Sequence, residues 1–200
     1  MCGMSPDTRQ QMVLTASKMF QREGYHATSW RSLVDEAGTP WGSIHHHFPG
    51  GKSELGVAAI EAGSEGVLAL IDHCFSTATD AGQAVGRWFE LSGRLLTESG
   101  YSAGCPVATV ALETAVTPGP LHDTTRSAFD AWERRLASHL RRAGASRRSA
   151  ADAAVAVLAL LEGALLLARV RGSTAPMRTA ARNAEAIATA AVEGTPATRP

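Results

Sequence analysis

The chain has 200 residues, of which 44% are hydrophobic and 19% are charged. This composition is typical of a globular protein and excludes wholesale disorder. Nineteen basic and nineteen acidic residues give a formal net charge of zero, so the overall charge neither requires nor excludes a nucleic-acid partner. The three cysteines, Cys2, Cys74 and Cys105, are widely spaced, which argues against a disulfide scaffold or a zinc finger.

The first predicted helix extends from Pro6 to Gly24, and its apolar residues repeat with the spacing of one helical face. These residues are Met12, Val13, Ala16, Met19 and Phe20. A second, shorter helix is predicted to begin at Thr28, which would act as its N-cap. The residues predicted to be buried in this second helix are Trp30, Leu33, Val34 and Ala37.

A third short helix is predicted to follow a tight turn at Gly38. Thr39 is its predicted N-cap, Pro40 is its predicted first residue, and His47 lies near its end. Three short helices, two of them joined by a glycine-containing turn, are typical of a helix-turn-helix module.

The rest of the chain is predicted to form six more helices, which makes the fold class all-α with about nine helices. The six segments are about 52–77, 81–99, a short segment ending near 116, 121–143, 150–170 and 175–192. Gly56, Gly63 and Gly66 are predicted to weaken or bend the first of these helices. The apolar stretch 153–170 is interrupted by Glu162, which favours a core or interface helix over a membrane span. The N-terminus lacks the apolar run of a signal peptide, so a cytoplasmic location is expected.

The segment from Thr28 to Lys52 has the sequence TSWRSLVDEAGTPWGSIHHHFPGGK. It resembles the TetR family of bacterial transcriptional regulators, and the matching elements are Gly24-Tyr25, Thr28, the DEAG at 35–38, Gly42-Ser43-Ile44, His47-Phe48 and Lys52. The extra glycine in PGGK and the GCPVA at 104–108 resemble the LmrA/YxaF-type branch. The resemblance implies an N-terminal DNA-binding domain, assigned to 1–51, and a ligand-binding and dimerisation domain, assigned to 52–200. It also implies repression as the usual mode of regulation.

A recognition helix must present small or hydrogen-bonding residues to the major groove, and Gly42 and Ser43 meet that requirement. Trp41 can either contact a thymine methyl group or pack within the turn, and the sequence leaves both open. Thr28 and Lys52 are predicted to hold phosphates at helix N-termini. The full set of predicted DNA-binding residues, some of them implied by the resemblance, is Thr28, Arg31, Thr39, Pro40, Trp41, Gly42, Ser43, His45, His46 and Lys52.

The three adjacent histidines, His45, His46 and His47, do not indicate a metal site. Consecutive residues on a helix point about 100° apart, so the three imidazoles cannot converge on one ion. We therefore predict no metal and no cofactor. His47 is predicted to face inward as a structural residue.

The C-terminal segment is predicted to bind an effector between apolar walls that carry a few polar groups, although a plain core explains any single residue. The predicted ligand-binding residues are Trp88, Phe89, Leu95, Cys105, Val107, Val110, Glu113, Phe129, Trp132 and Glu162. The last two helices are predicted to form a homodimer interface, because a helix that is apolar on nearly every side must be covered. The residues predicted for that interface are Leu158, Leu165, Ala180, Ala184 and Ala188.

The predicted function is that of a TetR-like repressor. It would bind a near-palindromic operator in double-stranded DNA and be released by a small, largely apolar or aromatic effector. No catalytic role and no membrane partner are predicted, since no catalytic motif is present. Two alternatives remain open. One is a thiol-based redox or electrophile sensor that uses Cys105, with Cys74 as its partner. The other is a helical partner-binding protein without specific DNA binding.

Overall fold

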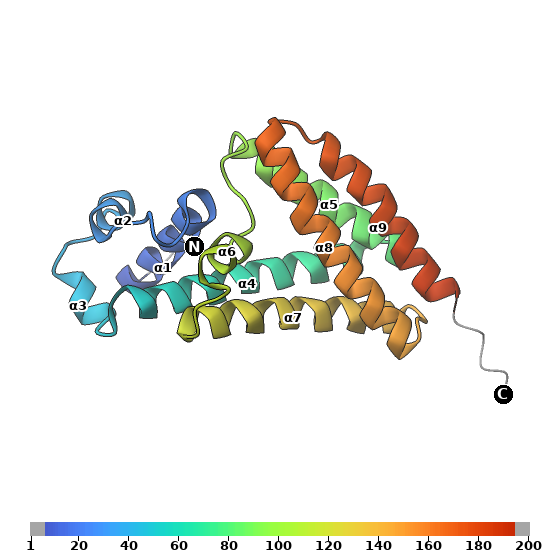
Figure 1. Cartoon of the computed structure of the whole chain (residues 1–200), viewed down its shortest axis with the longest axis horizontal. Coiled ribbons are helices and arrows are strands. Elements are labelled where there is room, and N and C mark those ends of the chain that lie inside the picture. Colours follow the sequence, from blue (N-terminus) through green and yellow to red (C-terminus); the bar gives the residue numbers. More distant parts are fainter. Residues whose placement is uncertain (1–6, 195–200) are drawn as a thin grey trace, which may run out of the picture. The chain divides into compact units, whose positions relative to one another are not determined.

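The computed structural model describes residues 7–194, and within that range it contains nine α-helices and no β-strand (Figure 1). This result confirms the all-α prediction. The helices are α1 (Thr8–Glu23), α2 (Trp30–Ala37), α3 (Ser43–His47), α4 (Gly51–Thr77), α5 (Ala81–Glu98), α6 (Ala108–Thr114), α7 (Pro120–Arg142), α8 (Arg147–Arg171) and α9 (Ala175–Glu193).

The chain forms two compact units. Of the described residues, the first unit contains 7–66 together with Cys105–Ala128, and the second contains Val67–Gly104 together with 129–194. Helices α4 and α7 each contribute to both units, so neither unit is one continuous stretch of sequence.

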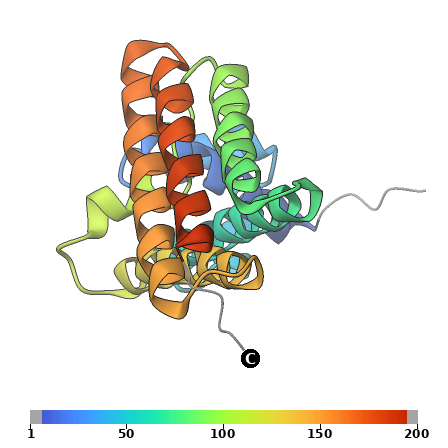
Figure 2. The same ribbon diagram turned by 90° about the vertical axis from the view of Figure 1, so that its right-hand side faces the viewer.

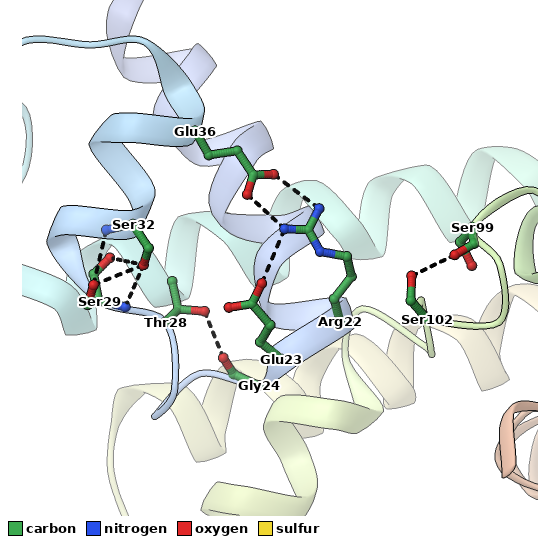
Figure 3. Close-up of polar contacts among 9 residues, drawn as sticks. All are labelled: Arg22, Glu23, Gly24, Thr28, Ser29, Ser32, Glu36, Ser99 and Ser102. Atoms are coloured by element: carbon green, nitrogen blue, oxygen red, sulfur yellow. Dashed lines mark hydrogen bonds and ion pairs between the residues drawn. The ribbon is translucent and has the colours of Figure 1, made fainter.

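In the first unit, α1 packs against both α2 and α6. All five apolar residues predicted for the first helix are buried, as are three of the four predicted for the second. Trp30 is the exception: it is half-buried, and its ring lies 6.3 Å from that of Phe48. On the surface, Arg22 of α1 forms an ion pair with both carboxylate oxygens of Glu36 of α2 (Figure 3). An exposed pair of this kind contributes about 0–1 kcal/mol, so burial of the apolar faces holds these helices together.

Close packing explains two of the three α4 glycines that were predicted to weaken or bend the helix, Gly56 and Gly63, whereas open space surrounds Gly66. A Cβ on Gly56 would lie 2.6 Å from a methyl carbon of Leu121, and one on Gly63 would lie 2.9 Å from Pro106. Both contacts are too short for a larger residue. Helix α4 is continuous over 27 residues. Its glycines do not end it, because a glycine within a helix costs only about 1 kcal/mol in helix propensity.

In the second unit, α9 packs against both α5 and α8 along much of its length (Figure 2). Helix α8 begins at Arg147, because Ser146 caps it by accepting a hydrogen bond from the Ser149 N–H at 3.1 Å. The helix therefore starts three residues before its predicted start at about residue 150. In the same unit, Asp72 of α4 accepts hydrogen bonds from Arg135 and His139 of α7.

Helix α8 is the one helix of the described residues that is long and apolar enough to cross a membrane. It has 25 residues, so its length does not distinguish it from a membrane-spanning helix. Eight of its residues are nonetheless buried within the chain, on the side that packs against α9 and α5. This burial identifies α8 as a core helix of the second unit.

Candidate nucleic-acid interface

The helix-turn-helix predicted from the sequence lies in the first unit and consists of α2, a short turn and α3. Helix α2 ends at Gly38, which adopts the left-handed conformation at φ 62°. The Thr39 N–H then donates to the Val34 carbonyl at 3.1 Å, which closes the helix end. Glycine is favoured at this position because a Cβ would destabilise the positive φ.

The regular part of α3 begins later than predicted. The Ser43 N–H donates to the Pro40 carbonyl at 3.0 Å, and the Ile44 N–H donates to the Trp41 carbonyl at 3.2 Å. These three-residue hydrogen bonds form a tighter turn ahead of the α-helix. Thr39 is therefore not the N-cap, and the helix starts at Ser43, with Gly42 as the cap residue.

The start of α2 also differs from the prediction by one residue. Ser29 is the N-cap, and it forms a reciprocal capping box with Ser32 (Figure 3). Thr28 is only 1% exposed, and its hydroxyl donates to the Gly24 carbonyl at 2.9 Å. Ser29 is exposed and lies where the predicted phosphate contact of Thr28 was expected, at the helix N-terminus. The spacing of two serines three residues apart is compatible with this capping box, but Thr28 also has a favourable N-cap side chain.

The predicted DNA-binding residues differ in exposure. Six of them are exposed: Arg31, Pro40, Trp41, Gly42, His45 and His46. Ser43, Thr39 and Lys52 are half-buried, and Thr28 is buried. The indole of Trp41 is 56% exposed, so packing within the turn does not account for this side chain. His47 is half-buried, and its ring meets the edge of His46 with 4.8 Å between centroids.

Lys52 lies at the start of α4 and is held against the protein surface. Its Nζ is 4.5 Å from the centroid of the Tyr25 ring and donates to the His26 carbonyl at 3.4 Å. Burial lowers the pKa of Lys52, an effect that the negative charge of Glu113 opposes. Burial also raises the pKa of Tyr25, and Glu113 raises it further.

A further cation lies beside the recognition helix. The Arg9 guanidinium is positioned over the ring of Phe48, 5.2 Å from its centroid, and Phe48 caps the C-terminal end of α3. Arg9 is itself exposed, and no spacing within the helix-turn-helix sequence indicates its place next to α3. It is a candidate phosphate-binding residue that sequence reasoning missed.

Comparison with known proteins agrees with this geometry. Residues 13–59 match the family model "Bacterial regulatory proteins, tetR family", and residues 81–183 match "Transcriptional regulator LmrA/YxaF-like, C-terminal domain". The chain is a TetR-family transcriptional regulator. It is 30% identical over 172 residues to the HTH-type transcriptional regulator LmrA of Bacillus subtilis, covering 86% of this chain and 91% of that protein. It is also 30% identical to YxaF of the same organism, over 86% of this chain and 90% of that one.

Solved structures of TetR regulators share the fold. A regulator from Legionella pneumophila superposes with a TM-score of 0.80 at 23% identity, covering 92% of this chain and 98% of that chain. A second, from Rhodobacter sphaeroides, also gives a TM-score of 0.80, at 22% identity, covering 90% and 98%. At this level of identity the likeness establishes the arrangement of helices.

The ten residues predicted to bind an effector divide between the two units. Cys105, Val107, Val110 and Glu113 belong to the first unit, and the other six belong to the second. In the second unit, the rings of Trp88 and Phe89 meet edge to face with 6.2 Å between centroids, and those of Phe129 and Trp132 with 5.3 Å. A cavity of about 540 Å³ lies between α5 and α9, and Phe89 contributes to its wall.

Two of these ten residues do not fit a pocket wall. Leu95 is 58% exposed, because its neighbour Leu96 occupies the buried side of α5 and successive residues point about 100° apart. The carboxylate of Glu113 accepts a hydrogen bond from the His26 N–H at 2.8 Å, within the first unit. That contact spans 87 residues of sequence, and no local pattern predicts it.

Both cysteines in the part of the chain that the structure describes, Cys74 and Cys105, are buried. Cys74 is completely inaccessible, and burial raises the pKa of its thiol. The sulfur of Cys105 accepts a hydrogen bond from the Ala108 N–H at 3.3 Å, at the start of α6. A buried thiol with a raised pKa reacts slowly, since the thiolate is the nucleophile.

The residues predicted for the dimer interface are largely used inside one chain. Leu158, Ala180, Ala184 and Ala188 are buried where α8 and α9 pack together, and Leu165 is half-buried. Ala184 is 0% exposed, so a glutamate at this position would disrupt the chain itself and cannot serve as a clean test of dimerisation. Helix α8 exposes four other large apolar residues: Val155, Leu166, Leu167 and Val170.

Proposed function

We propose that this TetR-family regulator is a homodimeric repressor. It binds a near-palindromic operator in double-stranded DNA and leaves the operator when a small, largely apolar or aromatic effector binds. Residues 1–51 form the DNA-binding domain, to which Lys52 at the start of α4 adds a phosphate contact, and residues 52–200 bind the effector and dimerise. The protein acts in the cytoplasm and has no catalytic activity.

The observation that carries the DNA-binding proposal is the exposed surface of the helix-turn-helix. Trp41, His45 and His46 are exposed on the turn and on α3. An exposed indole at this position can contact a thymine methyl group, and the imidazoles can hydrogen-bond to phosphates or base edges. Arg9, Arg31 and Lys52 supply the positive charge that phosphate contacts need.

Selection of bound duplexes from a random pool tests this proposal. We expect two related half-sites, because a two-fold symmetric dimer binds a palindrome. Trp41→Ala should change the base preference at one step of each half-site, and Lys52→Ala should weaken all sequences about equally. Arg148→Ala, which removes one exposed charge from the second unit, is the control. Absence of any salt-sensitive, sequence-dependent binding by the folded protein would contradict the proposal.

The dimer proposal depends on the exposed apolar residues of α8. A groove of about 410 Å³ runs between α8 and α9 and is lined by small residues such as Ala159, Gly163 and Ala180. Small side chains permit close approach of a helix from a second copy. Exposed apolar residues beside such a groove need a partner to cover them.

Light scattering on Val170→Glu measures this directly. Val170 is 78% exposed within the chain, so a charge there should not unfold the monomer. We expect about twice the 21.0 kDa chain mass for the wild type. The mass of the variant should shift toward that of a single chain. Val116→Glu, at a still more exposed position in the first unit, should leave the mass unchanged. A monomeric wild type at micromolar concentration would contradict the proposal.

The effector proposal rests on the aromatic residues of the second unit. Release requires that the effector bind the DNA-free form better, and a tenfold loss of operator affinity needs about 1.4 kcal/mol of coupling. Phe129→Ala removes the half-buried ring of the Phe129–Trp132 pair. It should lower the affinity for the effector more than the affinity for the operator. If apolar and aromatic compounds that bind show the same affinity with and without operator, this mechanism is wrong.

A further inference from the structure

Helix α6 reaches the DNA-binding part of the chain through Glu113. The Oε2 atom of Glu113 accepts a hydrogen bond from the His26 N–H at 2.8 Å. Its Oε1 atom lies so close to Gly24 that a Cβ there would collide with it. Helix α6 also packs against α1 within the same unit. The carboxylate of Glu113 therefore packs against one side of the turn between α1 and α2, residues 24–28.

Lys52 contacts the same turn through the backbone carbonyl of His26. Its ammonium donates to the His26 carbonyl at 3.4 Å and lies 4.5 Å from the centre of the Tyr25 ring. The Tyr25 ring is fixed in turn by an edge contact with Phe20 at 5.4 Å and by the space that Gly56 leaves on α4. One backbone residue, His26, is thus held by a carboxylate at its N–H and by an ammonium at its C=O.

We propose that Glu113 is a positioning residue of the DNA interface, which holds the Tyr25–His26 backbone so that Lys52 is fixed where a DNA phosphate can reach it. A long, flexible side chain binds more tightly when its bound conformation is already populated in the free protein. Glu113 does not touch DNA in this role. The inference rests on the proposed function in one respect, the phosphate contact of Lys52.

Glu113 has two opposite effects on DNA affinity, and two variants separate them. Its negative charge repels phosphates, and its hydrogen bond positions Lys52. Glu113→Gln removes the charge and keeps an acceptor for the His26 N–H. Glu113→Asp keeps the charge but shortens the side chain by one methylene, so the acceptor no longer reaches. Glu113→Ala removes both.

Operator affinity of these variants is the first test. We expect Glu113→Gln to bind as tightly as the wild type or more tightly, and Glu113→Ala and Glu113→Asp to bind about fivefold more weakly. The salt slope of the weakened variants should fall by about one for each Lys52 lost from the interface, as it does in Lys52→Ala. In a Lys52→Ala background, Glu113→Ala should have little additional effect, because the residue it positions is gone.

These outcomes distinguish the failure of each idea. If Lys52→Ala leaves operator affinity and the salt slope unchanged, the proposed phosphate contact of Lys52 is wrong. If Lys52→Ala weakens binding but Glu113→Ala does not, or weakens it equally with and without Lys52, Glu113 is not a positioning residue. Glu61→Ala, an exposed glutamate on α4 of the same unit, controls for loss of one negative charge.

A spectroscopic readout tests positioning without DNA. The chain contains two lysines, Lys18 and Lys52, so the ε-methylene signals can be assigned with Lys18→Arg. Because the ammonium of Lys52 lies over the Tyr25 ring, its ε-protons should be shifted upfield by the ring current. We expect the shift to persist in Glu113→Gln and to approach the Lys18 value in Glu113→Ala and Glu113→Asp. An unchanged Lys52 shift in both weakened variants would overturn the proposal, and either variant suffices if the other does not fold.

Discussion

Helices α2 and α3 contain 8 and 5 residues, whereas α5, α8 and α9 contain 18, 25 and 19. In the short helices, one terminal residue decides where the exposed side chains lie. Ser29 fixes the start of α2, and Gly38 fixes its end. In the long helices, the ends matter less, and the distinction between the buried and exposed sides decides what each residue does. In the first unit, the positions of the candidate DNA-binding side chains therefore depend on where helices begin and end. In the second unit, the role of a residue depends on which face of its helix it occupies.

The largest effect expected from this contrast is in α5, because two predicted pocket residues lie on different sides of this helix. Trp88 is 1% exposed, and Leu95 is 58% exposed. We expect Trp88→Ala to lower the free energy of unfolding by about 3–5 kcal/mol and Leu95→Ala to change it by less than about 0.5 kcal/mol. Urea unfolding followed by circular dichroism measures both. Similar losses for the two variants would show that the exposed side of α5 also contributes to the core.

Gly24 tests the importance of a helix end in the first unit. It ends α1 at φ 90° and ψ 168°, a conformation that residues with a side chain rarely adopt. We expect Gly24→Ala to cost about 1–3 kcal/mol, since it adds backbone strain and also displaces the Glu113 carboxylate. Gly66→Ala on α4 is the control, because open space surrounds that position. The control should stabilise the chain by about 0.5–1 kcal/mol, and thermal unfolding of the two variants should move in opposite directions.

The order and faces of the helices were predictable because apolar periodicity is a local signal. The buried residues of α1 follow from their spacing alone, and the glycine at 38 marks a turn without further information. The start of α2 was not predictable by the same reasoning, because Thr28 and Ser29 both have favourable N-cap side chains. The choice between them depends on the Gly24 carbonyl, which accepts the Thr28 hydroxyl and leaves Ser29 to cap the helix.

The role of Glu113 was not predictable from the sequence for a different reason. Its partner, the His26 N–H, is a backbone group that carries no sequence signature, and it lies 87 residues away. A glutamate on a short helix gives the same pattern whether it faces solvent, an effector or another helix. Glu113 was predicted to be a polar group of the effector pocket, and only the packing of α6 on α1 reveals the contact that it makes.

The cap of α2 gives a smaller expected effect at a helix end. Removal of a serine N-cap leaves backbone N–H groups without a partner and typically costs about 1 kcal/mol. We expect this loss for Ser29→Ala and about the same loss for the double variant with Ser32→Ala, because the two hydroxyls act as one capping box. Thr28→Ser keeps the hydroxyl that donates to the Gly24 carbonyl and should be nearly neutral. If Thr28→Ser costs more than Ser29→Ala in chemical denaturation, the hydroxyl of Thr28 is not the group that matters there.

The smallest expected effect is the pH dependence that Lys52 and Tyr25 give to stability. Burial lowers the pKa of Lys52, whereas an unfolded lysine has a pKa of about 10.4. Between those two pKa values the unfolded chain binds more protons than the folded one, so the contribution of Lys52 to stability increases with pH. Burial raises the pKa of Tyr25, so above about 10 the folded chain retains a proton that the unfolded chain has lost. The contribution of Tyr25 to stability therefore decreases with pH in that range.

Urea unfolding of the wild type and of Lys52→Met, from about pH 8 to about pH 11, isolates the lysine term, because all other titrating groups cancel in the difference. The stability of the wild type relative to Lys52→Met should increase toward the alkaline end. The stability of the wild type relative to Tyr25→Phe should decrease there. The two opposite trends come from neighbouring groups in one contact, so a difference of the same sign for both variants would mean that burial does not control their pKa values. Glu113→Gln should steepen the lysine trend, because removal of the carboxylate leaves burial unopposed and lowers the pKa of Lys52 further.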